Sequence, residues 1–321
     1  MKAWQFTGTN QPLELNEVPE PTPGPGEVVV DVKAAGVCHS DVTALDDPGW
    51  MGLFQNGLPR TMGHENAGVI SAVGEGMDHW KVGDRVGLAP VMADGDALGY
   101  GKWDGGFAPK LKATDDNLVR LPDEVPFDFG AMATDAGLTA YGAIVSTGGL
   151  KPGMRVGVIG LGGLGYLGAR IAVLKGAEVY AAEVNPKTRE LADEIGLAGV
   201  AESITEFKDK GLELIVDYAG FGTTTAEALE TLVEKGTVVQ VGMGKLESTI
   251  NTYPLIVNQL TLKGSKSGTT EDLAGIYELM KDGSLKAPIN HITHAEIPEA
   301  IDKLREGGVI GRFIAMYDDA E

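Results

Sequence analysis

The chain has 321 residues, of which 43% are apolar, and a formal net charge of -20 at pH 7. This length predicts two domains, and the negative charge disfavours nucleic acids and anionic membranes as partners. No stretch of roughly 20 apolar residues offers a membrane span, and the N-terminus lacks the apolar segment of a secretory signal. We therefore expect a cytoplasmic protein with no membrane partner.

Short β-type runs separated by Pro and Gly dominate the chain up to about residue 125, for example at 27–32 and 67–73. Helical periodicity is scarce in this part of the chain. The Gly-rich and Asp-rich connection at 90–106 is predicted to be a surface loop.

From about residue 137 the pattern changes to apolar runs that alternate with helical segments, which is expected for a parallel sheet with crossover helices. The predicted strands are 156–159, 178–182, 214–218 and 237–241, followed by a helix over 273–281 and a closing strand over 312–316. We therefore predict an α/β chain that combines a doubly wound Rossmann-type domain with a β-rich domain. The first covers 137–268, and the second covers 1–136 and 269–321.

Residues 160–165 read GLGGLG, which fits the G-x-G-x-x-G motif of dinucleotide-binding loops. A β-type run precedes the motif and a helical pattern follows it, which is the context that dinucleotide binding by such a loop requires. The glycines allow a tight turn, close approach of the backbone to a pyrophosphate, and close packing of the helix on the strand. The candidate binding residues in this loop are Gly160, Gly162, Gly163 and Gly165.

Glu183 ends the next predicted strand, about 20 residues beyond the loop, where a carboxylate binds the adenosine ribose hydroxyls. The same carboxylate would repel the 2′-phosphate of NADP, so NAD is favoured. Lys187 and Arg189 follow closely and could instead receive that phosphate, which leaves NADP as the alternative.

Cys38 and His64 carry the thiolate and imidazole groups that zinc prefers, and Glu65 is adjacent to the histidine. Taken singly, a lone cysteine is more often a small core residue and a lone histidine a hydrogen-bonded structural one. Cys38 is the single cysteine in the sequence, which excludes an intrachain disulfide and a four-cysteine structural zinc site.

Four short segments extend this pattern along the chain: GVCHSD at 36–41, GHENAG at 63–68, VGDRV at 82–86 and KPG at 151–153. In order and spacing they resemble the zinc-containing medium-chain alcohol dehydrogenases over essentially the whole chain. The resemblance implies a GroES-like catalytic domain and an NAD-binding Rossmann domain. We expect a homodimer or homotetramer, and the choice between them stays open. The resemblance also implies hydride transfer between the nicotinamide cofactor and a primary or secondary alcohol or its aldehyde or ketone.

By this resemblance, Cys38, His64 and Asp135 are the ligands of one catalytic zinc ion, and Glu65 is a nearby carboxylate that exchanges with solvent at the metal. Asp135 stands where many members have a second cysteine. A carboxylate oxygen is an acceptable zinc ligand, so three protein ligands and an open position are retained. A helix cap is the alternative role for Asp135. The cysteine-rich lobe that holds a structural zinc in many relatives is missing, so one zinc per chain is implied.

Ser40 resembles the hydroxyl that receives the alcohol proton in this family, and Asp41 resembles the carboxylate that orients the zinc histidine. The spacing of Cys38 and Ser40 predicts that both side chains project to one side of a local extended segment. Thr43 stands where the proton relay usually continues to a histidine, so the proton must leave by another route such as water.

Further residues match the family at the cofactor. Thr139 and Leu164 match positions that pack around the nicotinamide ring, and Arg312 matches an arginine near the pyrophosphate and Glu65. Asn185 is a candidate contact of the adenosine ribose, although a turn role explains it nearly as well. Candidates for an apolar substrate pocket are Trp50, Met51, Phe54 and Trp103, although aromatic residues in loops are at least as often part of a local core.

Two other functions stay open. One is a zinc-free quinone or enone reductase of the same superfold, whose members lack the pair of Cys38 and His64. The other is a catalytically silent NAD-binding protein, because fold alone does not specify function.

Overall fold

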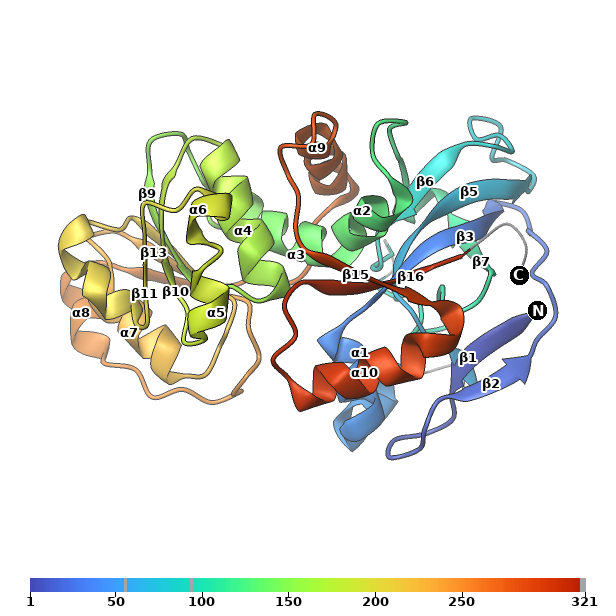
Figure 1. Cartoon of the computed structure of the whole chain (residues 1–321), viewed down its shortest axis with the longest axis horizontal. Coiled ribbons are helices and arrows are strands. Elements are labelled where there is room, and N and C mark those ends of the chain that lie inside the picture. The colour runs from blue at the N-terminus through green and yellow to red at the C-terminus, as the bar shows by residue number, and fades with distance from the viewer. Residues whose placement is uncertain (55–56, 93–94, 318–321) are drawn as a thin grey trace. The chain divides into compact units, whose positions relative to one another are not determined.

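The computed structural model describes residues 1–54, 57–92 and 95–317 (Figure 1). The chain divides into two compact units. Unit 1 comprises Met1–Asp135, Leu273–Lys281 and Pro288–Glu321, and unit 2 comprises Ala136–Asp272 and Asp282–Ala287. The sequence predicts domain boundaries at 136/137 and 268/269. It does not predict that Asp282–Ala287 belongs to unit 2.

The described residues of unit 1 form two sheets. Its strands are β1 (Lys2–Phe6), β2 (Glu14–Glu17), β3 (Glu27–Val37), β4 (Arg60–Thr61), β5 (Glu65–Val73), β6 (Arg85–Leu88), β7 (Lys110–Thr114), β8 (Leu118–Arg120), β15 (Ile289–Thr293) and β16 (Arg312–Met316). The larger sheet has the order β15-β16-β3-β5-β6-β8, with β7 also paired to β3, and the smaller sheet has the order β2-β1-β4. Among these strands of the described residues of unit 1, all pairings are antiparallel except that of β15 with β16.

The core of unit 1 follows from alternating apolar residues along its strands. Val28, Val30 and Val32 of β3 are buried and share one face of the strand, because successive side chains point to opposite faces. The helices of this part of the chain are α1 (His39–Asp46), η1 (Pro48–Leu53), η2 (Asp115–Asn117), α2 (Phe127–Met132), η3 (Ala133–Gly137), α9 (Thr270–Met280), η6 (His294–Glu296) and α10 (Ile297–Glu306). In α10, the apolar residues recur at helical spacing and join the same core.

The connection at 90–106 is not the surface loop that its composition predicts. Leu98 and Tyr100 are buried in the core of unit 1. The backbone amides of Gly105 and Gly106 donate to the carbonyls of Thr61 and Gly63, at 2.9 and 2.8 Å. These long-range bonds, together with local ones within 95–103, satisfy much of the polar backbone in the described part of the segment. Residues 98–101 and 105–106 are therefore buried in spite of their glycines.

Unit 2, all of whose residues are described, contains one six-stranded parallel sheet. Its strands are β9 (Arg155–Ile159), β10 (Glu178–Ala182), β11 (Gly199–Ala201), β12 (Leu214–Asp217), β13 (Thr237–Gln240) and β14 (Thr261–Gly264). Their order is β11-β10-β9-β12-β13-β14, so the order reverses between β9 and β12. Ligands of such sheets bind beyond the carboxyl ends of the strands at this reversal. The predicted doubly wound sheet is confirmed.

Two helices of unit 2, α3 and η4, precede β9 in sequence, and the others lie between the strands, as expected for crossover connections (Figure 1). They are α3 (Leu138–Tyr141), η4 (Gly142–Thr147), α4 (Gly163–Leu174), α5 (Pro186–Arg189), α6 (Ala192–Ile195), η5 (Ile204–Lys210), α7 (Thr223–Thr231) and α8 (Thr252–Val257). In the part of the chain that the structure describes, none of the helices combines the length and the apolar character needed to cross a bilayer.

Candidate metal centre

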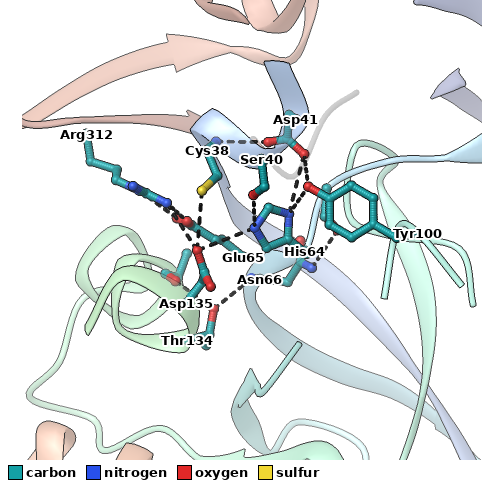
Figure 2. Close-up of polar contacts among 12 residues, drawn as sticks. Cys38, Ser40, Asp41, His64, Glu65, Asn66, Tyr100, Thr134, Asp135 and Arg312 are labelled. Atoms are coloured by element: carbon teal, nitrogen blue, oxygen red, sulfur yellow. Dashed lines mark hydrogen bonds and ion pairs between the residues drawn. The ribbon is translucent and has the colours of Figure 1, made fainter. Parts of the chain in front are cut away.

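Four side chains with metal-binding groups meet within unit 1, and they come from three separate segments of the chain (Figure 2). They belong to Cys38, His64, Glu65 and Asp135, whose potential ligand atoms all lie within 4.8 Å of one another. Cys38 Sγ is 3.5 Å from Asp135 Oδ2, and His64 Nε2 is 3.4 Å from the same oxygen. The three residues that the sequence proposes as ligands are thus brought together.

The pairing of β3 with β5 positions two of these residues. Gly36 of β3 is opposite Glu65, the first residue of β5, and His64 immediately precedes that strand. A side chain at position 36 would overlap the carboxylate of Glu65. Glycine at this position therefore leaves the space that the Glu65 side chain occupies.

Helix α1 positions Cys38 and Ser40, and here the predicted extended segment is wrong. The helix begins at His39, directly after Cys38, and the carboxylate of Asp41 accepts a hydrogen bond from the Cys38 amide at 2.8 Å. This contact satisfies one of the amides that a helix start leaves unpaired. Ser40 still reaches the cluster, because its Oγ lies 3.3 Å from His64 Nε2.

Asp135 lies in η3, a π-helical turn that follows α2. It is inside a helical run and not at its start, so the alternative role as a helix cap is not the one it takes. Thr134 fixes this turn, because its hydroxyl donates to the Ala131 carbonyl at 2.7 Å and accepts from the Asn66 amide at 3.1 Å. π-turns within helices are frequent at functional sites.

Arg312, the first residue of β16, compensates the acidic charge of the cluster. Its Nε donates to Glu65 Oε2 at 3.0 Å, and its Nη2 is ion-paired with the other Glu65 oxygen and lies 3.3 Å from Asp135 Oδ2. The side chain of Glu65 is 0% exposed and that of Arg312 is 8% exposed. Buried charges of this kind persist only when they are paired.

The surrounding charges shift the pKa values of two cluster residues. Burial opposes ionisation of the Cys38 thiol, but the positive charge of Arg312 and the contact with His64 outweigh it and lower the thiol pKa. Burial also opposes protonation of His64, but Asp41 and Asp135 raise its pKa well above the usual value. The lowered pKa favours the thiolate, which is the form of cysteine that binds metals.

Tyr100 is a member of the site that the sequence does not reveal. Its hydroxyl lies 2.7 Å from Asp41 Oδ1 and 2.9 Å from His64 Nδ1 (Figure 2). The direct separation of Asp41 Oδ1 from His64 Nδ1 is longer, at 3.4 Å. The apolar residues within the glycine-rich segment at 90–106 are the one sequence signal of its burial.

In unit 2 the glycine loop follows β9, as predicted. Gly160 has φ of +83°, a conformation that favours glycine, and a side chain at Gly165 would overlap the Gly160 carbonyl. Gly162 precedes α4, which begins at Gly163 and contains Leu164 in its first turn. A Cβ atom at Gly162 would meet nothing within 4 Å, so the backbone there is open to a ligand.

Glu183 directly follows β10 and contacts this loop. Its carboxylate accepts from the Leu161 amide at 2.7 Å and from the Asn185 amide at 2.8 Å. Asn185 caps α5 by accepting from the Lys187 amide at 3.0 Å. Arg189 donates to the Glu183 carbonyl at 2.7 Å, so this guanidinium is engaged with the backbone.

The remaining sequence candidates lie in several environments. Thr139 is half-buried in α3 of unit 2. Phe54 is a core residue stacked on Phe6 with ring centroids 4.3 Å apart, and it also packs edge-on against Tyr100. Its part in a substrate pocket stays a prediction. Trp50 packs edge-on against Tyr100, Met51 is exposed, and Trp103 lies under the Lys112 ammonium group.

Two family models and a full-length relative match the chain. The alcohol dehydrogenase GroES-like domain matches residues 24–123, and the zinc-binding dehydrogenase model matches residues 163–282. An alcohol dehydrogenase of Geobacillus stearothermophilus is 31% identical, over 99% of this chain and 100% of the relative. The chain belongs to the zinc-type alcohol dehydrogenases of the medium-chain dehydrogenase/reductase superfamily.

Solved structures of this superfamily share the fold. An acetophenone reductase from Geotrichum candidum, determined in complex with NAD, matches with a TM-score of 0.87 and 29% identity, over 100% of this chain and 98% of that one. An alcohol dehydrogenase from Aeropyrum pernix matches with a TM-score of 0.88 and 27% identity, over 99% and 100%. The β-rich unit is therefore GroES-like, and the chain is an oxidoreductase of the alcohol dehydrogenase type acting on small alcohols or carbonyl compounds.

Proposed function

We propose that this alcohol dehydrogenase is zinc-dependent and NAD-linked, and that it interconverts a primary or secondary alcohol with its aldehyde or ketone. The observation that carries the proposal is the convergence of Cys38, His64 and Asp135, three zinc-type ligands, beside a charge-compensated Glu65. In this proposal unit 1 is the catalytic domain, unit 2 binds NAD, and the protein forms a homodimer or homotetramer.

The donor set fits a zinc ion. Zinc accepts thiolate, imidazole and carboxylate ligands in one site, and three protein ligands leave a position open for substrate. The 4.8 Å limit on the ligand-atom separations requires only small side-chain adjustments to enclose one ion. When bound, zinc supplies a Lewis acid that polarises a carbonyl and makes an alcohol more acidic.

The residues around the cluster would handle the proton. Ser40 Oγ, beside His64 Nε2, is placed to accept a proton from an alcohol at the centre. Thr43 donates to the His39 carbonyl at 3.0 Å, so its hydroxyl is committed to the helix and leaves the onward step to water. Glu65 is proposed to exchange with solvent at the metal, so its carboxylate needs a second partner when it is not bound to the metal. Arg312 provides this partner.

The open backbone at Gly162 and the carboxylate of Glu183 support NAD as the cofactor. The amides at the start of α4 would face the pyrophosphate, and Glu183 would bind the adenosine ribose. In this proposal Thr139 and Leu164 pack around the nicotinamide and Asn185 assists at the ribose.

Purified protein tests the function directly. We expect about one zinc per chain and turnover of simple alcohols or ketones with NAD. Zinc-free protein that reduces a conjugated enone would establish the quinone reductase alternative. Protein that binds NAD without turnover on either panel would establish the catalytically silent alternative.

Replacement of Glu183 by serine is expected to raise kcat/KM with NADP relative to NAD by about tenfold or more, because repulsion of the 2′-phosphate is removed. Steady-state kinetics with both cofactors measures this ratio. Glu194→Gln, elsewhere in unit 2, is the control, because Glu194 contacts Tyr166 at 2.9 Å and should leave the ratio unchanged. An unaltered ratio in Glu183→Ser would remove Glu183 from the ribose site.

Replacement of Ser40 by alanine is expected to lower kcat by about 10²-fold or more while zinc content stays unchanged, because the proton acceptor is lost and the ligands are kept. The measurement combines metal analysis with turnover of a substrate whose chemical step is rate-limiting. Thr43→Val serves as the matched control on the same helix, since that hydroxyl already bonds to the backbone. Full turnover in Ser40→Ala would exclude the serine from proton transfer.

A further inference from the structure

The segment at 90–106 is tied to the strand edge that leads into His64. Beyond the bonds of Gly105 and Gly106, the Phe107 amide donates to the Met62 carbonyl at 2.8 Å. Arg60 reinforces the connection from the other side by donating to the Lys102 carbonyl at 3.1 Å. The segment is therefore held in register with the residues that immediately precede His64.

Tyr100 projects from this segment into the surroundings of the metal ligands. It is buried, and its ring contacts those of His64, Trp50 and Phe54 at centroid distances of 5.0, 5.9 and 6.2 Å. These rings fix the direction of the phenol. From this packed position the hydroxyl contacts Asp41 and His64 at the distances given above.

The chemistry of His64 fixes the direction of these hydrogen bonds. Its Nε2 faces Asp135 in the cluster, so a metal bound through Nε2 requires the proton on Nδ1. Nδ1–H can then donate to the Tyr100 oxygen, and the Tyr100 O–H can donate to Asp41 Oδ1. Both distances are typical of good hydrogen bonds, whereas 3.4 Å between Asp41 and His64 is long for one.

We propose that Tyr100 is a positioning residue for the metal ligand His64, and that its hydroxyl transmits the orienting effect of Asp41 to the imidazole. The proposal deepens the proposed zinc function and rests on it. Asp41 is then shared between two ligands, because its other oxygen accepts from the Cys38 amide. Outer partners of metal ligands fix the tautomer and ring orientation.

The test is Tyr100→Phe, which removes the hydroxyl and keeps the ring. Tyr317→Phe is the matched control, because the Tyr317 hydroxyl is also buried and also bonds to this segment, at the Gly106 carbonyl 2.7 Å away. Apo-protein is titrated with Zn²⁺ against a chromophoric chelator at fixed pH. We expect Tyr100→Phe to bind zinc about 10- to 100-fold more weakly, and Tyr317→Phe to bind it as the wild type does.

A double-mutant cycle separates positioning from general loss of packing. In an Asp41→Asn background, Tyr100→Phe should weaken zinc binding by a smaller factor, because the hydroxyl no longer transmits a carboxylate. If Tyr100→Phe weakened zinc binding by the same factor in both backgrounds, or bound zinc as tightly as the wild type, the role proposed for Tyr100 would be overturned. Neither result would overturn the proposed zinc function. A wild-type protein that binds no zinc would overturn the proposed zinc function as well, so the two failures are distinguishable.

Discussion

Replacement of Asp135 by alanine is expected to weaken zinc binding by about 10²-fold or more and to lower turnover in parallel. Structural zinc binding in proteins is worth roughly 10–16 kcal/mol over four ligands, so one ligand contributes on the order of 3 kcal/mol. Asp135 contacts Cys38, His64 and Arg312, and its removal reduces the proposed ligand set from three residues to two. Metal analysis after dialysis, together with kcat, measures both effects.

Two companion variants sharpen this experiment. Asp128→Ala removes a carboxylate from the preceding helix α2, where it pairs with His291 at 2.8 Å, and should keep full zinc content. Asp135→Cys supplies a thiolate and should also retain zinc, because zinc binds thiolate at least as readily as carboxylate. Full zinc and normal turnover in Asp135→Ala would contradict the assignment and point to Glu65 as the third ligand.

Replacement of Arg312 by methionine is expected to lower the free energy of unfolding of unit 1 by about 3–5 kcal/mol in chelator-treated protein. The substitution leaves the fully buried Glu65 and the adjacent Asp135 without their positive partner. Tryptophan fluorescence during urea denaturation reports this unit selectively, because all four tryptophans of the chain, Trp4, Trp50, Trp80 and Trp103, lie in it.

Arg305→Met is the control for this effect. Arg305 pairs with Asp46 at 2.8 Å, but its side chain is 38% exposed, and exposed pairs contribute about 0–1 kcal/mol. Adding Glu65→Gln to Arg312→Met should restore part of the lost stability, because the unpaired charge is removed. If the Arg312 and Arg305 variants lost the same stability, Arg312 would not be compensating a buried charge.

The parallel sheet of unit 2 could be predicted because its pattern is local. The predicted strand at 178–182 coincides with β10, and the run at 156–159 falls within β9. Strands of a parallel sheet are buried on both faces, so they appear as short apolar runs bounded by turn residues. The closing strand at 312–316, which coincides with β16, is recognisable by the same signal in unit 1.

Helix α1 and the burial of the segment at 90–106 depend on long-range contacts, which a local sequence pattern does not predict. Helix α1 has only eight residues, and the charged residue Asp41 is among those that it buries. The helix therefore shows little amphipathic periodicity. The segment at 90–106 is rich in glycine and aspartate, and its burial depends on bonds to residues 61–63, more than 25 residues earlier. The contact of Tyr100 with His64 therefore cannot be predicted from the local sequence.

A different kind of signal marks the candidate ligands. Cys38 and His64 are each ambiguous when read singly, and Asp135 is one of many carboxylates in an acidic chain. Their order among the motifs of a known family singled them out. The charge compensation by Arg312, the space left by Gly36 and the π-turn around Asp135 are consequences of packing that became visible only in three dimensions.

The single cysteine of this sequence gives the proposed centre a particular redox character. Cys38 has no second thiol in the sequence with which to form a disulfide, and its lowered pKa favours the reactive thiolate when no metal protects it. Oxidation of an unprotected thiolate proceeds through sulfenic acid to the irreversible sulfinic and sulfonic acids unless an external thiol intervenes. In the proposed zinc centre, loss of the metal would therefore leave this one sulfur atom open to oxidation.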